Sequence, residues 1–360
     1  MRAQVLGLDE LSAGDTERWR ELAAQAAEPN PFFEPEYVLP AADLIGGRRV
    51  GLAVVRETDG WSACLPVHHP RRWHRIPLGC VASWEHRYSF LGTPLVSSGR
   101  EEAALAAITR ELARQRGAAF VGFDALADEG PVREALRLAI EHRGIEEVAV
   151  NRHRRAVLRR SAAGEERLAV KGKHRRELER KRRRLEEELG GELRTVDRAE
   201  DAAAVEDFLD LEASGWKGRE GTAMAALEQD AEFFRAVCAA FRDLGRLHLL
   251  SLEAEGQRVA MACNLRAGEG VFCIKIAFDE RWRRYSPGAQ LVLDHVSWFE
   301  ERESAGWMDS CVQPDNELVN RLWPDSRGIA TLAVPAESVG GRMARAAIAG
   351  AVRLRDRRAG

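Results

Sequence analysis

Residues 271–293 read VFCIKIAFDERWRRYSPGAQLVL, and this stretch decides the fold of the second half of the chain. Its apolar run ends at Phe278 and predicts a strand. Ser286 favours a helix start because serine is a good N-cap, and Pro287 fits the first helical position because its missing N–H would have no partner there. A strand, a short loop and a helix are therefore expected in this order.

The start of this helix also predicts an anion site. Gly288 and Ala289 leave the first backbone N–H groups uncovered, and the loop before them carries three arginines, Arg281, Arg283 and Arg284. Uncovered N–H groups, the helix dipole and nearby cations together suit a phosphate or a pyrophosphate. The alternative is a well-capped helix with surface arginines, and the residues alone leave both interpretations open.

The surrounding pattern predicts a mixed sheet flanked by helices. We expect strands at 192–196, 246–252, 258–265, 270–278, 307–310 and 328–334, and helices at 201–214, 230–244, 288–303 and 342–355, with a short helix after Pro314. Three consecutive strands of antiparallel character, then a helix and another strand, are neither a regular βαβ series nor a pure sandwich.

The N-terminal half shows a similar coarse order. Strands are expected at 50–55, 61–66, 118–123 and 146–150, and helices at 15–27, 101–116 and 132–142. Residues 151–170 have no sustained apolar period and indicate a join. Because the chain has 360 residues, we predict two domains, 1–157 and 158–360, of an α+β fold class.

Composition excludes several classes of protein. No window reaches the roughly 18 consecutive apolar residues of a membrane span, and the N-terminus lacks the pattern of a signal peptide, so we expect a cytoplasmic protein. The six cysteines form no C-x-x-C pair, and the histidines lack metal-ligand spacing, so no metal site is predicted. The net charge of −3 implies no bulk attraction to nucleic acid.

A basic helix is expected at 171–189. It holds nine Lys or Arg between Lys171 and Arg184, and Leu178, Leu185 and Leu189 recur on one face. One interpretation is a helix that touches the phosphates of a tRNA. The other, which we favour, is a helix that packs through its leucines and links two domains.

Several motifs resemble the BioF2-like (CelD/BcsL-type) acetyltransferase family, a branch of the GNAT superfamily related to the FemAB transferases. The matching pieces are KHRR at 173–176 through Leu185, EASGWKG at 212–218, GTA at 221–223, GR at 245–246, YSPG at 285–288, and Asp309, Asn316 and Trp323. NPFFEP at 30–35 and WEHRYSFLGTPL at 84–95 resemble the family's leading region. One departure is Ser286, which stands where the first glycine of the superfamily's pyrophosphate loop would be.

The resemblance implies two tandem GNAT-like domains, each a mixed, largely antiparallel sheet flanked by helices. It also implies acetyl-CoA or another acyl-CoA as the donor, held along the strand at 270–278 and at the following helix start. The residues implied for this donor are Lys275, Arg283, Arg284, Ser286, Gly288 and Ala289.

Acyl transfer to an amine needs a group that removes the ammonium proton, because only the neutral amine attacks a thioester. Asp309, at a predicted strand end, is our first candidate, and Glu212 and Asp279 follow. Tyr285 is the candidate that protonates the departing thiolate. Each of these side chains has an alternative as a cap, a turn residue or a core residue.

Substrate-binding residues are expected in two places. Gly215 and Gly218 predict a helix end that presents Trp216 and Lys217 on a loop, where an aromatic and a cation are suited to a ligand. Trp84, His86 and Tyr88 alternate as on one strand face and either line a cleft or form an aromatic core patch.

These observations predict a transferase that moves an acyl group to an amine or hydroxyl of a small molecule or glycan, by family association in polysaccharide or cell-envelope biosynthesis. Two alternatives stay open. One is a FemAB-like aminoacyltransferase that uses charged tRNA, and the other is a non-catalytic scaffold of the same fold. Nucleic acid is not an expected partner, and a homodimer is left open.

Overall fold

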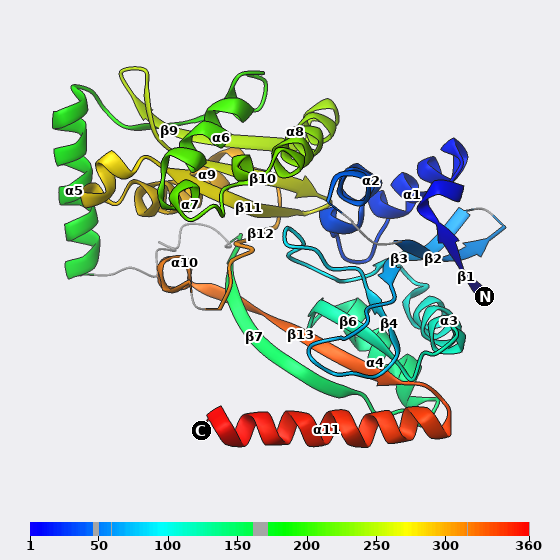
Figure 1. Ribbon diagram of the computed structural model, residues 1–360. Coiled ribbons are helices and arrows are strands. Elements are labelled where there is room, and N and C mark those ends of the chain that lie inside the picture. The colour runs from blue at the N-terminus through cyan, green and yellow to red at the C-terminus, as the bar shows by residue number, and fades with distance from the viewer. Residues whose placement is uncertain (46–49, 59, 161–171, 315, 360) are drawn as a thin grey trace. The chain divides into compact units, whose positions relative to one another are not determined.

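The chain folds into two compact units. The computed structural model describes residues 1–45, 50–58, 60–160, 172–314 and 316–359. The first unit comprises Met1–Arg154 and Arg327–Gly360, and the second comprises Arg155–Ser326 (Figure 1). The first unit is thus assembled from both ends of the chain, whereas we predicted division into 1–157 and 158–360. Residues 327–360 group with the N-terminal part, because the strand Asp325–Pro335 and the helix Val339–Ala359 pack there.

The first unit is built on one sheet. In spatial order its strands are β1 (Arg2–Gly7), β2 (Gly51–Glu57), β3 (Gly60–His68), β4 (Cys80–Ser83), β6 (Phe120–Ala127) and β13 (Asp325–Pro335), and β5 (Leu95–Val96) pairs with β3. Only the β4–β6 pair is parallel among these ladders. The helices are α1 (Ala13–Ala24), α2 (Pro35–Leu44), α3 (Glu101–Arg114), α4 (Pro131–Glu141) and α11 (Val339–Ala359).

The second unit has a similar plan. Its strands are β8 (Arg194–Asp197), β9 (Leu247–Ala254), β10 (Gln257–Ala267), β11 (Gly270–Phe278) and β12 (Trp307–Asp309), followed by the last residues of β7 (Val148–Arg159). The β11–β12 pair is parallel, and the other pairs are antiparallel. The helices are α5 (Lys173–Leu189), α6 (Ala204–Ser214), α7 (Trp216–Arg219), α8 (Glu228–Asp243), α9 (Pro287–Arg302) and α10 (Glu317–Leu322).

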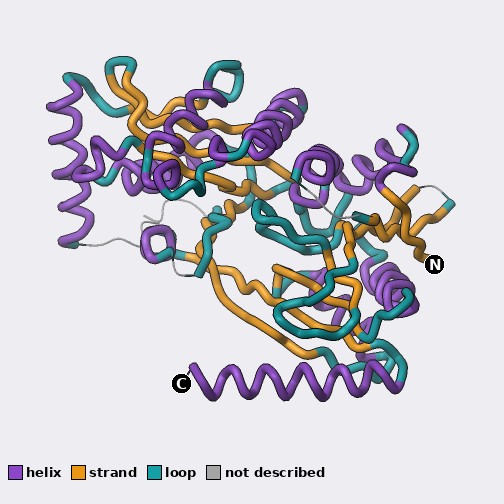
Figure 2. Tube along the Cα trace, viewed as in Figure 1, coloured by secondary structure: helices purple, strands orange, loops and turns teal. Residues whose placement is uncertain are grey.

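Each unit is therefore a mixed, largely antiparallel sheet flanked by helices, as Figure 2 shows by colour. The predicted α+β class is confirmed. Among the helices of the described residues, none combines the length and the apolar character that a membrane span requires.

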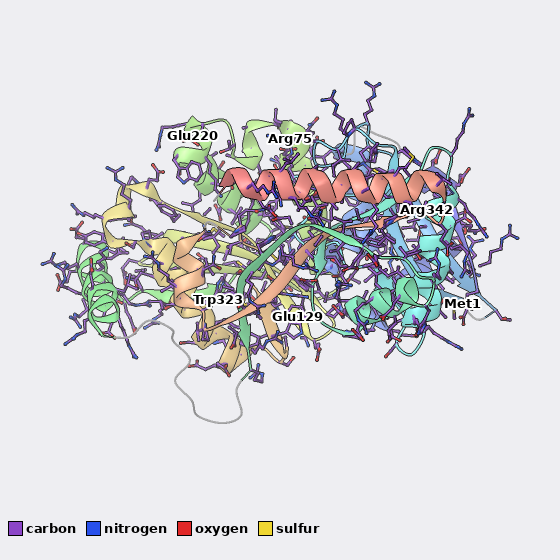
Figure 3. All side chains as sticks on the ribbon, turned by 90° about the horizontal axis from the view of Figure 1, so that it is seen from below. Met1, Arg75, Glu129, Glu220, Trp323 and Arg342 are labelled. Atoms are coloured by element: carbon purple, nitrogen blue, oxygen red, sulfur yellow. The ribbon has the colours of Figure 1, made fainter. Side chains whose placement is uncertain are left out.

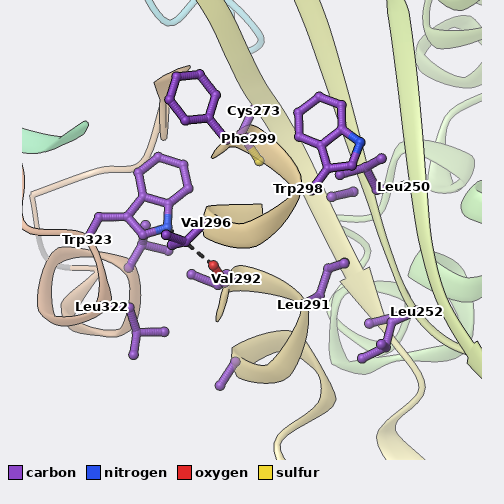
Figure 4. Packing of buried hydrophobic residues seen from close by; sticks show 14 of the residues in the cluster. Leu250, Leu252, Cys273, Leu291, Val292, Val296, Trp298, Phe299, Leu322 and Trp323 are labelled. Atoms are coloured by element: carbon purple, nitrogen blue, oxygen red, sulfur yellow. Dashed lines mark hydrogen bonds between the residues drawn. The ribbon is translucent and has the colours of Figure 1, made fainter. Parts of the chain in front are cut away.

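The core of the second unit fixes α9 against the sheet (Figure 4). Leu291 and Phe299 on α9 are fully buried, as are Leu250 and Leu252 on β9. Trp323 closes the cluster, and its Nε1 donates a hydrogen bond to the Val292 carbonyl at 3.3 Å. Because each large apolar side chain contributes about 1.5–3 kcal/mol on burial, this cluster holds the start of α9 in a defined place beside β11.

The sequence analysis missed the strands β1, β4 and β5 and the second half of β7. The segment interpreted as a join, from residue 151 onward, continues β7 as far as Arg159. Its sequence NRHRRAVLR is too rich in arginine for an apolar pattern, and its strand is specified by pairing with β12. The rest of the predicted join, 161–170, and Lys171 lie outside the described residues.

A histidine between two carboxylates ties the edge of the second sheet to the end of α9. His248 Nδ1 lies 2.7 Å from Asp197 Oδ2, and its Nε2 lies 2.9 Å from Glu303 Oε2. Burial alone would lower the pKa of His248, but the bonds to both carboxylates raise it to about 9. Since the pKa is raised on folding, this stabilisation is complete below the unfolded value of about 6.5 and is lost as the pH rises through about 9.

We expect His248→Gln to remove most of this pH dependence. The wild type should lose about 2 kcal/mol of unfolding free energy between about pH 6 and pH 10 through this one group, after discount for its partial exposure. Denaturant titrations of both proteins at the two pH values measure the difference. An equal change in unfolding free energy between the two pH values, in wild type and variant, would contradict the assignment.

Candidate active site

The centre of the candidate site is a bulge in β11. In the register with β10, Lys275 pairs with Cys263 and Cys273 pairs with Asn264, so Ile274 has no partner of its own. Such an extra residue switches the faces of a strand. Val271 and Cys273 belong to the core cluster under α9, and beyond the bulge Ile276 and Phe278 pack on it instead. Lys275 is thereby turned to the other face.

The edge of β11 that faces β12 has no strand partner over its second half. Its ladder with β12 covers Gly270–Phe272, whereas its ladder with β10 continues to Phe278. The two parallel strands therefore separate after Phe272, and in the described part of the second unit no other strand pairs with this edge. An unpaired edge of this kind offers backbone N–H and C=O groups to an extended ligand.

Two lysines converge on one buried carboxylate beside this edge. The Lys217 Nζ lies 2.8 Å from Glu212 Oε1, and the Lys275 Nζ lies 2.5 Å from the same oxygen. The second oxygen, Oε2, accepts a hydrogen bond from the Met224 backbone N–H at 2.9 Å. Lys217 also donates to the Ile276 carbonyl of β11 at 3.3 Å. These three groups together carry one net positive charge when ionised, and Asp230 also attracts Lys275.

Burial and charge act against each other in this cluster. Burial by itself would raise the pKa of Glu212, but the charges of Lys275 and Lys217 and their hydrogen bonds outweigh it and lower the pKa. For Lys275, burial is the larger effect, so its pKa is lowered despite the attraction of Glu212. An additional negative charge nearby would stabilise this buried ammonium. Lys275 is therefore suited to a reaction in which an oxyanion forms.

Trp216 and Lys217 lie on the short helix α7, and not on the loop that we predicted. Gly215 ends α6 as expected, but Gly218 lies inside α7, where a Cβ atom would come within 1.8 Å of the Ala213 carbonyl oxygen. The carboxylate of Glu280 accepts a hydrogen bond from the Trp216 backbone N–H at 2.7 Å and so caps α7. Trp216 is 44% exposed, and it lines a small pocket together with Glu212, Lys217 and Phe278.

A larger pocket of about 650 Å³ adjoins this one and shares Glu280 with it. Its walls carry three ion pairs, Arg258–Asp207, Arg281–Asp279 and Arg219–Glu280. Asp210 and Arg283 line it too. A pocket with charges of both signs is suited to a polar ligand.

The start of α9 differs in detail from the prediction. Ser286 occupies the N-cap position with φ 56° and ψ 54°, a left-handed conformation that favours glycine, and its side chain does not cap the helix. Its Oγ accepts a hydrogen bond from Lys181 Nζ at 3.1 Å. Gly288 approaches β11 closely, since a Cβ there would lie 3.3 Å from Phe278 Cδ1. The helix start and the end of β11 are therefore neighbours.

Two of the three arginines before α9 have partners other than the helix start. Arg281 pairs with Asp279 at 2.6 Å, and Arg284 pairs with Glu188 of α5 at 2.6 Å. Lys181 of α5, which our prediction did not include, supplies the cation that contacts Ser286. The stripe Leu178, Leu185 and Leu189 is buried, which explains how α5 is held there.

Tyr285 is 7% exposed and belongs to the core cluster of the second unit. Its hydroxyl donates a hydrogen bond to Glu188, which raises the pKa of Tyr285. The Arg284 guanidinium stacks 4.7 Å from the centre of its ring. The hydroxyl proton of Tyr285 is therefore hydrogen-bonded to the Glu188 carboxylate of α5.

Asp309, our first candidate for the base, is fully buried and paired with Arg155. Arg155 Nε lies 2.8 Å from Asp309 Oδ1, and Arg155 Nη2 donates to Oδ2 at 2.8 Å. The Cys311 backbone N–H donates to Oδ1 at 2.9 Å. Both carboxylate oxygens are thus occupied, which is the arrangement of a structural ion pair. Arg155, in the missed part of β7, gave no signal in the sequence.

Trp84, His86 and Tyr88 lie in the first unit, on the segment after β4, and do not share a strand face. They nevertheless come together, because the ring centres of Trp84 and His86 are 4.9 Å apart and those of His86 and Tyr88 are 6.5 Å apart. Tyr37 joins them at 5.8 Å from His86. Burial lowers the pKa of His86 to about 3, so its ring is neutral. The structure thus forms an aromatic cluster there.

A second group in the first unit has the residue types of a cation site, although we predicted none. Ligand atoms of His74, Glu85 and Asp124 lie within 4.8 Å of one another. Asp124 already receives hydrogen bonds from Trp73 Nε1 at 2.8 Å and lies 2.6 Å from His74 Nε2. The Asp124 carboxylate therefore already has partners on both oxygens.

Comparison with solved structures supports the fold of the whole chain. The crystal structure of FemX has a TM-score of 0.56 at 10% identity and covers 92% of this chain and 97% of its own. A conserved protein of unknown function from Bacteroides thetaiotaomicron has a TM-score of 0.57 at 12% identity and covers 91% of this chain and 98% of its own. No curated protein matches the sequence. At these identities the likeness is one of fold.

The sequence match is confined to the second unit and covers the elements of the candidate site. Residues 172–314 match the model described as an acetyltransferase (GNAT) domain. They include α5, the bulged strand β11, the charge cluster and the start of α9. Residues 172–314 of this chain are therefore a domain of the GNAT superfamily, which agrees with the BioF2-like family that the motifs indicated.

Proposed function

We propose that the protein transfers an acyl group from acyl-CoA to an amine or hydroxyl acceptor. The observation that carries this proposal is the edge of β11 beyond Phe272, which has no strand partner and ends beside the start of α9. An extended ligand with amide groups can pair with such an edge, and its phosphates can meet the helix start. The pantetheine arm and the pyrophosphate of CoA have these groups in this order.

In the proposed complex, the pyrophosphate contacts the backbone N–H groups of Gly288 and Ala289. Lys181, which reaches Ser286, supplies a nearby positive charge. Arg283 and Arg284 remain candidates for the outer phosphates, but Arg284 would first have to leave Glu188. The thioester would then lie along the second half of β11, near Lys275.

The chemistry is a direct transfer. The acceptor nitrogen or oxygen attacks the thioester carbonyl carbon, a C–N or C–O bond forms, the C–S bond breaks, and the thiolate takes up a proton. Lys275 stabilises the negative charge on the carbonyl oxygen, because its buried ammonium gains from that charge. Glu212 holds Lys275 and Lys217 in place. Because both of its oxygens are occupied, it accepts the acceptor's proton in this proposal only after one of these partners leaves it.

Asp309 takes a different part in this proposal. Since both of its oxygens contact Arg155 or a backbone N–H, it fixes the end of β12 where the strands separate. Tyr285 remains a candidate for the thiolate proton only if its hydroxyl leaves Glu188. The acceptor, for which we propose a small molecule or a glycan, enters through the pocket of about 650 Å³ beside Glu280.

Gly288→Glu is expected to weaken acetyl-CoA binding by more than about tenfold, or about 1.4 kcal/mol. The new carboxylate repels the pyrophosphate and fills the space beside the helix start. Calorimetric titration with acetyl-CoA, and then with longer acyl-CoAs, measures the affinity. Gly288→Ala is the matched control, because its Cβ has the same 3.3 Å approach to Phe278 without the charge.

Equal affinities of wild type and a folded Gly288→Glu protein would remove the start of α9 from the donor site. Absence of any acyl-CoA binding to the wild type would overturn the proposal. Nanomolar binding of charged tRNA in that case would favour the aminoacyltransferase alternative, since non-specific binding lies in the range of about 10⁻⁴–10⁻⁶ M.

A further inference from the structure

The C-terminal helix α11 has two apolar faces. One face is buried in the first unit, where Ala344 and Ile348 pack with Trp73 and Phe120. The other face is exposed. Val339, Met343 and Leu354 are 64%, 69% and 59% exposed, the highest values among the large hydrophobic side chains of the described residues.

These exposed side chains share one stripe of the helix. Positions 339, 343, 346, 350 and 354 follow the spacing i, i+4, i+7, i+11 and i+15, which keeps them on one side. Ala346 and Gly350 complete the stripe between the larger residues. The stripe therefore runs along most of the length of α11 and faces solvent, opposite to Ile348.

Arg342, Arg353 and Arg357 lie along this stripe. The described side chains of α11 include five arginines, Arg342, Arg345, Arg353, Arg355 and Arg357, against one acidic residue, Asp356. Arg345 pairs with Glu146, and Arg355 pairs with Asp356. The other three have no carboxylate partner among the residues that the structure describes. Figure 3 shows α11 from this side, with Arg342 labelled near its first turn.

A groove of about 640 Å³ lies along the flank of α11 within the first unit. Most of its wall is apolar, with Ile76, Pro77 and Leu78 on one side and Ala347, Ala351 and Val352 on the helix. Arg75 and Arg355 also line it. An apolar channel with cations in its wall matches the chemistry of an anionic amphiphile, with an acyl chain and a charged headgroup.

We propose that this face of α11 binds the surface of an anionic phospholipid bilayer. A helix that lies in the interface buries its apolar stripe at the boundary of headgroups and acyl chains, while flanking arginines contact phosphates. A second copy of the chain is a poorer occupant. Two such faces would bring arginines against arginines, and like charges across an interface oppose association.

The experiment is flotation of the full-length protein with vesicles. We expect binding to vesicles of phosphatidylcholine with about one third phosphatidylglycerol, little binding to phosphatidylcholine alone, and weaker binding as salt rises. Since each arginine near an anionic surface contributes about fivefold, the triple variant R342Q, R353Q and R357Q should lower the partition coefficient roughly a hundredfold.

The apolar stripe is tested separately. The double variant M343D and L354D should lower binding by more than about tenfold, because it places carboxylates in the interface. The matched control is L227D and L244D, which changes two exposed leucines of the second unit, 46% and 45% exposed, and should leave binding unchanged. All variants alter exposed positions, so unfolding curves should stay close to the wild type.

Three results would overturn the proposal. The first is no binding to anionic vesicles, and the second is equal binding to neutral ones. The third is an equal loss of binding in the control variant. A dimer in sedimentation that M343D and L354D dissociate, without lipid binding, would show that a second copy covers this face. Loss of acyl-CoA binding has no bearing on this test, which does not depend on the proposed reaction.

Discussion

Asp309→Asn is expected to lower the free energy of unfolding by about 3–5 kcal/mol, because it leaves the buried guanidinium of Arg155 without its counter-charge. The Arg155 side chain is 4% exposed and the Asp309 side chain is 0% exposed, so water cannot replace the lost partner. Denaturant unfolding of the purified variant measures the loss. The activity per folded molecule should stay close to that of the wild type.

The matched control is the double replacement Arg155→Met with Asp309→Leu. Removing both charges avoids the unpaired guanidinium, and replacing a buried pair with apolar residues is often close to neutral. We therefore expect most of the lost stability to return. A stable Asp309→Asn protein whose turnover falls by about 10²–10⁴ would show instead that Asp309 is the base that the sequence suggested.

Lys275→Met is expected to lower kcat by about 10²–10³ while leaving acyl-CoA affinity nearly unchanged. The substitution keeps the aliphatic stem and removes the ammonium that stabilises the oxyanion, and loss of one such group has this magnitude. Glu212 stays paired with Lys217, so the cluster should remain folded. Steady-state kinetics with a saturating donor, together with calorimetric titration, separate the two effects.

Lys217→Met is the comparison within the same cluster. Lys217 contacts the same carboxylate but lies on α7, so its loss should mainly raise the KM of the acceptor. If Lys275→Met kept full turnover, the pair with Glu212 would be structural, and the oxyanion would have to be stabilised by backbone N–H groups alone.

The sequence predicted the order of elements well where the apolar pattern was regular. The strand at 270–278 has its predicted bounds, and the helix expected at 288–303 is Pro287–Arg302. The strand predicted at 146–150 ended too early, because the second half of β7 is rich in arginine and contains a histidine. Its pairing with β12 comes from residues far along the chain, which no local window includes.

The candidate site, too, was predicted only in part from the sequence. The resemblance placed Lys275, Lys217 and Glu212 in the site region, but their convergence depends on the bulge at Ile274. A one-residue insertion that turns a strand face leaves no trace in composition or spacing. The pairing of Asp309 was unpredictable for a related reason, since Arg155 lies in the segment interpreted as a join.

The assembly of the first unit from both ends of the chain has a consequence for synthesis on the ribosome. β6 pairs with β13, and the whole second unit is encoded between them. At about 5–20 residues per second, β6 waits on the order of ten seconds or more with an open edge before its partner emerges. The second unit can close in that interval, so the later unit in sequence becomes the earlier one to fold. A nascent chain stopped before residue 325 should therefore present an unpaired strand, which is the kind of surface that chaperones bind.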